Sequence, residues 1–189
     1  MPFERYCDDA IIHCTTKKQA EFIKNAVARR MKECRLELNQ EKTHVVYCKN
    51  HIHREGQKSV SFDFLGYTFR PLRRPTKNGW KLTYFPCMSM AAKNDVREKL
   101  KKIINRSFKG TVQMLAKILN PKLRGWYQYY CKYSQWTTRG LWYWLNQKIV
   151  KWIMDSRKMS VGKARRWLVK VYESCPNFFE HWLTTRPYK

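Results

Sequence analysis

Two adjacent carboxylates near the start of the chain, Asp8 and Asp9, are its clearest candidate chemical groups. They stand between an aromatic-containing run and the β-branched residues Ile11 and Ile12, an order that predicts strand, tight turn and strand. Both acids would then lie at one exposed tip. Neighbouring carboxylates repel each other, so a divalent cation that prefers oxygen ligands, Mg²⁺ or Mn²⁺, would stabilise the pair. A plain hairpin turn without a metal is the alternative.

Apolar residues at helical spacing follow this hairpin. Thr16 and Gln19 fit a capping box, so we predict a helix over 16–35 that packs one apolar stripe on a sheet. Basic residues on its outer face fit either nucleic acid contact or a solvated surface. A strand is expected at 45–47 and a polar loop at 49–59.

Aromatic and small residues alternate over 60–69, which predicts another strand. Gly66 within it predicts a bend or a close approach of the backbone to a neighbour. An ordinary hairpin packed on a core explains the same pattern.

Prolines and a turn signal divide the segment that follows. Residues 70–75 are basic and broken by proline, Asn78 and Gly79 predict a turn, and Pro86 is expected to end the next strand. We therefore place a domain boundary near residue 88.

The period of the apolar residues becomes helical after this boundary. One stripe contains Val96 and Leu100, and a second contains Leu115 and is expected to end at Asn120 and Pro121. Several basic helices in a row predict a small bundle.

The net charge of the chain indicates what kind of partner it binds. It is +25, from 39 Lys and Arg against 14 Asp and Glu, which implies a polyanion and by default nucleic acid. Residues 1–88 carry 17 basic and 9 acidic side chains, whereas residues 89–189 carry 22 and 5. The second half is therefore predicted to be the stronger binder. No apolar run has the length needed to cross a bilayer, so no membrane attachment is expected.

Cysteine usage indicates the redox environment. The seven cysteines are odd in number and include no Cys-x-x-Cys pair, which is typical of free thiols in a reducing compartment. We expect the bacterial cytoplasm, with an organelle as the second choice.

Four motifs, in this order, resemble those of group II intron reverse transcriptases/maturases. They are Arg5-Tyr6-Cys7-Asp8-Asp9, with Cys7 where Ala is commoner, Leu36-Glu37-Leu38-Asn39-Gln40-Glu41-Lys42-Thr43, Phe62-Asp63-Phe64-Leu65-Gly66-Tyr67-Thr68-Phe69, and Leu119-Asn120-Pro121-Lys122-Leu123-Arg124-Gly125-Trp126-Tyr127-Gln128-Tyr129-Tyr130. The resemblance spans essentially all 189 residues. It implies an α+β fold: a partial palm of β-hairpins plus one helix over 1–88, then an all-α thumb bundle, the maturase-specific domain X, over 89–189.

The resemblance also implies roles for particular residues. Asp8 and Asp9 would be catalytic ligands of Mg²⁺, and Lys42 would act as a general acid or phosphate contact, unless it is a plain turn lysine. The primer grip would comprise Phe64, Leu65, Gly66 and Tyr67. Candidate RNA contacts are Lys122, Arg124, Arg165 and Arg166, whereas Trp126 and Tyr130 are expected to belong mainly to the core.

The function implied is that of an RNA-directed DNA polymerase that extends a DNA primer on an RNA template with dNTPs and binds its intron RNA to assist splicing and mobility. The family also needs a third metal-binding Asp from an upstream strand, which does not precede Met1 here. We therefore expect the isolated chain to be inactive as a polymerase, with a separate N-terminal half as a candidate partner. The alternative is a stand-alone RNA-binding splicing factor that uses only the basic thumb. A generic DNA-binding domain ranks third.

Overall fold

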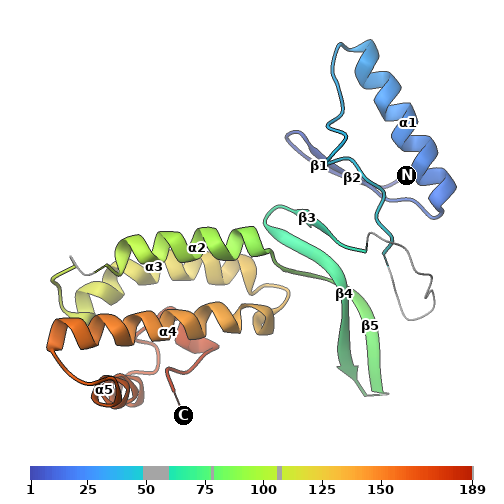
Figure 1. The fold of residues 1–189 in the computed structure, drawn as a ribbon. Helices are drawn as coiled ribbons and strands as arrows, with labels where there is room; N and C mark the ends of the chain where they lie inside the picture. Colours follow the sequence, from blue (N-terminus) through green and yellow to red (C-terminus); the bar gives the residue numbers. More distant parts are fainter. Residues whose placement is uncertain (49–59, 78, 106–107, 189) are drawn as a thin grey trace. The chain divides into compact units, whose positions relative to one another are not determined.

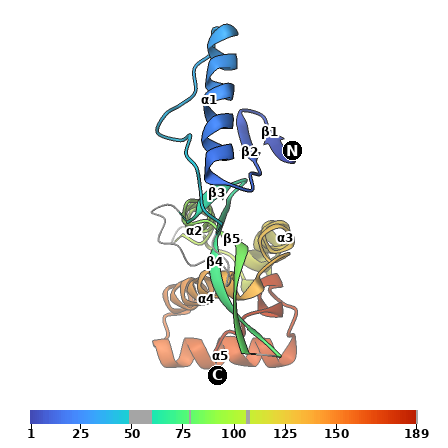
Figure 2. The ribbon, with the colours of Figure 1, turned by 90° about the vertical axis from the view of Figure 1, so that its right-hand side faces the viewer.

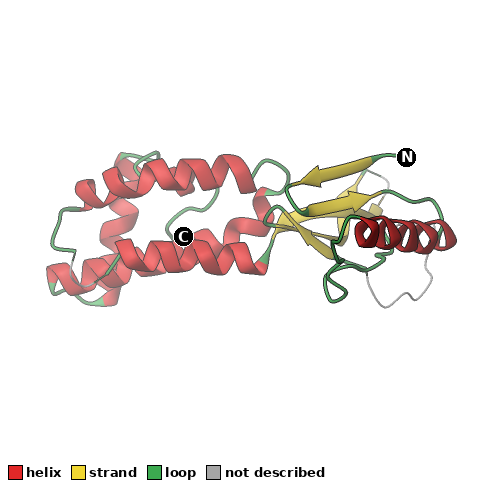
Figure 3. Cartoon of the chain, turned by 90° about the horizontal axis from the view of Figure 1, so that it is seen from above, coloured by secondary structure: helices red, strands yellow, loops and turns green. Residues whose placement is uncertain are grey.

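A computed structural model describes residues 1–48, 60–77, 79–105 and 108–188 (Figure 1). The chain forms two compact units, one made of Met1–Phe64 and Phe69–Phe85, the other of Leu65–Thr68 and Pro86–Lys189. Two small antiparallel sheets precede a helical region (Figure 3), which confirms the predicted α+β class. The loop expected at 49–59 and Asn78 of the expected turn lie outside the described residues.

The first unit begins with the predicted hairpin. Strand β1 (Phe3–Tyr6) pairs antiparallel with β2 (Asp9–Ile12), and helix α1 (Lys17–Glu33) follows. The Thr16 hydroxyl caps the helix by accepting a 3.1 Å hydrogen bond from the Gln19 amide, while the Gln19 side chain accepts from the Thr15 amide at 2.9 Å. The first of these bonds satisfies a donor that the first turn of a helix leaves free, which explains why α1 starts where the sequence predicts.

Two expectations for this unit are wrong. The apolar stripe of α1 (Ile23, Val27, Met31) is only half-buried, no residue of the helix is fully buried, and Phe22 beside the stripe is 72% exposed. Residues 45–47 form no strand, because a strand needs a pairing partner and none of the described strands pairs with them.

A three-stranded sheet has the order β3 (Phe62–Phe64), β4 (Tyr67–Thr76) and β5 (Gly79–Met88), and Figure 2 shows β4 and β5 side by side as a long ribbon. Contrary to expectation, β4 runs through Pro71 and Pro75 and β5 runs past Pro86. Proline is tolerated where no hydrogen bond is needed from its nitrogen. The edge strand β5 provides such positions, and so does β4 beyond the reach of the three-residue β3.

The second unit contains the core. Its elements are α2 (Met90–Ile103), α3 (Val112–Tyr130), α4 (Gln135–Arg157), α5 (Val161–Ser174) and the short 3-10 helix η1 (Glu180–Leu183). Helix α4 packs on α5 and on α2, and α3 packs on η1. Every buried hydrophobic residue among those described belongs to this unit. Trp126 and Tyr130 pack against the core while partly buried, as expected. Among the described residues, no helix combines the length and apolar character required to cross a membrane.

Helix α3 continues through Pro121, whereas the sequence predicted a break there. Proline inside a helix costs about 3 kcal/mol. Leu115, Leu119 and Leu123 lie on one face of α3 and are completely buried, and each contributes about 1.5–3 kcal/mol. Tertiary packing therefore outweighs the local preference of proline.

A polar cluster joins α4 to the C-terminal segment. The buried Asn146 side-chain oxygen accepts hydrogen bonds from Trp182 Nε1 at 2.9 Å and from His181 Nε2 at 2.8 Å. Because the indole nitrogen only donates, this contact fixes the orientation of the amide. Its nitrogen donates to the carbonyls of Thr185 and Arg186 at 3.4 and 3.2 Å.

Candidate catalytic hairpin and nucleic-acid interface

The candidate metal ligands lie at the tip of the β1–β2 hairpin. Tyr6 pairs with Asp9, which leaves Cys7 and Asp8 as the two turn residues. Cys7 has φ +53, a left-handed conformation that an L side chain adopts at a cost of about 1–2 kcal/mol. The Arg5 Nε donates a 3.0 Å hydrogen bond to the Cys7 carbonyl and so holds this turn. Both carboxylates are exposed.

The two carboxylates supply part of a coordination shell. Mg²⁺ is commonly held by one or two protein carboxylates and completes its octahedron with water and substrate phosphates. Asp8 and Asp9, adjacent and exposed on a tight turn, fit that kind of ligand set. Over the described part of the chain, no cluster of three or more His, Cys, Asp or Glu side chains could enclose an ion.

Lys42 lies on a separate turn in the same unit. The Asn39 side-chain oxygen accepts hydrogen bonds from the backbone amides of Glu41 and Lys42, both at 3.1 Å, and forms an Asx turn. This turn leaves Lys42 exposed. Within the residues that the structure describes, Lys42 forms no ion pair with Asp8 or Asp9.

The predicted primer-grip residues form a tight turn between β3 and β4. Leu65 and Gly66 occupy its two central positions with φ +50 and +75, the signature of a type I′ hairpin. Phe64 belongs to the first compact unit, and Leu65, Gly66 and Tyr67 belong to the second. The expected close approach at Gly66 is present, because a Cβ there would lie 3.0 Å from the Tyr130 hydroxyl.

Four tyrosines hold this turn. The Tyr67 ring lies 5.2, 5.6 and 5.8 Å from the rings of Tyr129, Tyr130 and Tyr133, and its hydroxyl donates to the Tyr129 carbonyl. Burial, with a smaller contribution from the other tyrosines, raises the pKa of Tyr67 to about 12. The phenol therefore stays protonated and remains a donor at neutral pH. We call Tyr67, Tyr129, Tyr130 and Tyr133 the tyrosine cluster.

The candidate RNA contacts differ in availability. Lys122 is exposed on α3, and Arg165 and Arg166 are exposed on α5. Arg124 is engaged within the protein, since its Nη2 lies 3.2 Å from a carboxylate oxygen of Glu180 and its Nε lies 3.4 Å from the other. The structure thus leaves Lys122 free to reach a phosphate and gives Arg124 an internal partner.

Comparison with known families agrees with this order of elements. Residues 1–69 match the reverse transcriptase (RNA-dependent DNA polymerase) family, and residues 93–172 match the group II intron maturase-specific domain. The two matches confirm the predicted resemblance to group II intron reverse transcriptases/maturases, because the chain contains part of a reverse transcriptase domain followed by a maturase-specific domain. No curated protein matches it. The reverse transcriptase match includes the Asp8-Asp9 hairpin, and the maturase match includes all four candidate RNA contacts.

Sequence reasoning missed two aromatic residues of the second unit that lie beside cations, the exposed Tyr133 and the half-buried Tyr188. Tyr133 is 51% exposed with Lys132 Nζ 5.6 Å from its ring, and Arg165 lies 5.1 Å from the ring of Tyr188. Aromatic faces beside cations are surfaces on which bases of single-stranded nucleic acid stack. The signal was present in the sequence as aromatics next to Lys or Arg, but only the fold separates exposed rings from those of the core.

Proposed function

We propose that this chain binds intron RNA through its basic helical unit and forms part of an RNA-directed DNA polymerase in which Asp8 and Asp9 are catalytic. The observation that carries the proposal is a paired hairpin with two exposed carboxylates at its tip, in one chain with a packed helical unit rich in Lys and Arg. The proposed domains are a palm portion over 1–88 and the maturase-specific thumb over 89–189.

Each candidate residue has a proposed role in the polymerase. Asp8 and Asp9 would hold Mg²⁺, which stabilises the charge that develops on the transferring phosphoryl group. Lys42 would contact the incoming dNTP phosphates or protonate the leaving pyrophosphate. The turn at 64–67 would hold the 3′ end of a DNA primer on its RNA template, using backbone groups and ring faces that recognise no particular sequence.

Polymerisation is proposed for the larger assembly. Two-metal phosphoryl transfer needs ions held against both the attacking and the leaving oxygen, and two carboxylates on one turn are too few ligands for this. We therefore expect the purified chain to leave dNTPs unincorporated and to need a polypeptide that supplies the third carboxylate, such as a separate N-terminal half. The bacterial cytoplasm is the proposed location, because all seven cysteines are free.

The alternative function, a stand-alone RNA-binding splicing factor, is favoured by one observation. All the buried hydrophobic residues of the described structure lie in the unit that contains the maturase match, so this unit has a core of its own. In that case the carboxylate hairpin would have no catalytic role.

RNA binding by the full chain tests the shared part of both functions. The affinity for structured intron RNA should fall steeply with salt, because Lys and Arg displace counterions from phosphates, and should exceed the affinity for duplex DNA at matched salt. Equal affinity for both would favour a generic nucleic-acid binder. The double variant D8A/D9A should bind RNA normally but abolish dNTP incorporation in any reconstituted polymerase. Undiminished incorporation would remove Asp8 and Asp9 from the catalytic site.

A further inference from the structure

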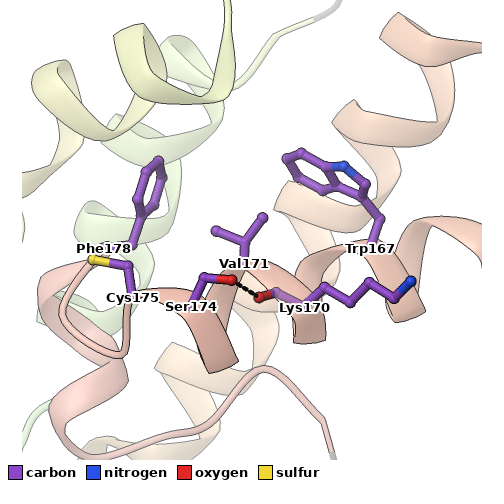
Figure 4. A pocket seen from close by; sticks show the side chains of 6 residues that line it. All are labelled: Trp167, Lys170, Val171, Ser174, Cys175 and Phe178. Carbon is purple, nitrogen blue, oxygen red and sulfur yellow. Dashed lines mark hydrogen bonds between the residues drawn. The ribbon is translucent and has the colours of Figure 1, made fainter.

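A pocket of about 310 Å³ opens along α5 and the segment that follows this helix. Figure 4 shows its lining, which consists of Trp167, Lys170, Val171, Ser174, Cys175 and Phe178. All six belong to the second unit. None of the roles proposed above uses this pocket.

Two aromatic rings stand at the ends of the pocket. In Figure 4 the side chains of Trp167, Val171 and Phe178 point to the same side, with Val171 between the two rings. Both rings are supported from behind, since Phe178 lies 5.1 Å from Phe179 and both rings pack against the hydrophobic core. Supported rings bind a flat ligand with little loss of conformational freedom.

Positive charge lies along the helix that forms this apolar surface. Helix α5 carries four basic side chains, Lys163, Arg165, Arg166 and Lys170, against the single carboxylate of Glu173. The Arg157 guanidinium lies over the Trp167 ring, 4.4 Å from its centre. Lys170 lines the pocket itself, and no carboxylate does. An apolar floor with a cationic border is complementary to a ligand that combines a flat ring with a phosphate.

We propose that this pocket, defined here as the α5 pocket, takes one unpaired base of single-stranded RNA, which stacks on Trp167 or Phe178 while Lys170 contacts a neighbouring phosphate. The inference rests on the proposed RNA binding and adds a site for a base to it. Stacking on an aromatic side chain tolerates any base, so the α5 pocket would recognise an unpaired nucleotide and not a sequence. An apolar side chain of a protein partner would fit the floor but would leave the cationic border without a complement.

Variants of the two rings test the proposal in the full chain. The probes are an oligouridine RNA of about 12 nucleotides, within the usual site size for single strands, and an abasic RNA of equal length. Trp167→Leu and Phe178→Leu should each weaken oligouridine binding by about 5- to 150-fold, the range expected for one stacked base. The slope of affinity against salt should stay the same, because neither variant removes a cation. Phe22→Leu, which changes an exposed ring of the first unit, is the matched control and should bind as the unchanged chain does.

A second measurement needs no variant, which matters because both rings also pack on the core. Cys175 is exposed and lines the pocket, whereas Cys34 is exposed in the first unit. Oligouridine should slow the alkylation of Cys175 by iodoacetamide and leave Cys34 unaffected, and the abasic RNA should protect neither.

The outcomes separate this inference from the proposed function. If the unchanged chain binds no RNA, RNA binding itself fails. If the chain binds RNA but both ring variants retain its affinity and Cys175 stays reactive, RNA binding stands and the α5 pocket is not a base site. Equal protection by oligouridine and abasic RNA would also overturn the inference, because it would show that phosphates alone cover the pocket.

Discussion

The Tyr129 hydroxyl donates a hydrogen bond of 2.8 Å to the carbonyl oxygen of Leu65, 64 positions earlier in the chain. This bond ties the turn between β3 and β4 to the end of α3. Tyr129→Phe removes the donor and should lower the free energy of unfolding of the second unit by about 0.5–1.5 kcal/mol. Thermal or denaturant unfolding checks this. Tyr133→Phe is the control, because the Tyr133 hydroxyl forms no hydrogen bond among the described residues, and an equal loss in both variants would contradict the prediction.

Replacing Gly66 or Gly140 with alanine should change the free energy of unfolding in opposite directions. At Gly66 a methyl group would lie 3.0 Å from the Tyr130 hydroxyl on a backbone with φ +75, so Gly66→Ala should destabilise by about 1–2 kcal/mol. Gly140 lies inside α4, and a methyl group added there would meet no atom within 4 Å, so Gly140→Ala should stabilise by about 0.5–1 kcal/mol. Paired denaturant titrations measure both changes, and the same sign for both would refute the assigned contacts.

The buried His181 should make stability depend on pH. Burial lowers its pKa from 6.5 to about 3, so the unfolded chain binds a proton between these values that the folded chain does not. The contribution of neutral His181 to the free energy of unfolding is fully present above pH 6.5. As the pH decreases toward 3, the free energy of unfolding should fall by at most about 1.4 kcal/mol per pH unit because of this group. Denaturant titrations between these pH values test it. His181→Phe should flatten the dependence, and His44→Gln, which replaces an exposed histidine, should leave it unchanged. An unaltered slope in His181→Phe would assign the dependence to other groups.

Substitutions at Lys122 and Arg124 should affect different properties, RNA binding for Lys122 and folding stability for Arg124. Lys122→Ala should weaken RNA binding and reduce the salt slope by about one, as expected for one lost phosphate contact. Arg124→Ala should instead lower stability, since it leaves Glu180, which is 20% exposed, without its cation. Filter binding over a salt series and thermal unfolding distinguish the two. A salt slope that falls only for Arg124→Ala would reverse the assignment.

Much of the local structure follows from the sequence because local interactions determine it. The hairpin at Asp8-Asp9 and the start of α1 at Thr16 depend on neighbouring residues, and both were predicted. Pro71 and Pro121 were misinterpreted, because strand pairing and the burial of Leu119 override what proline favours locally. The Asn146 cluster could not be predicted, since its partners lie 35 to 40 positions away and have no periodic pattern. The same holds for the pairing of Arg124 with Glu180.

The unequal distribution of buried residues implies a hierarchy of local opening. Segments with few buried apolar contacts open at low free energy, whereas core helices open only when the whole unit unfolds. Backbone amides of α3 and α4 should therefore exchange with deuterium slowest, and those of β1, β2 and α1 fastest. The two carboxylates thus lie on one of the weakly protected described elements, where binding of a polypeptide or a nucleic acid would supply much of the order that the proposed catalysis requires.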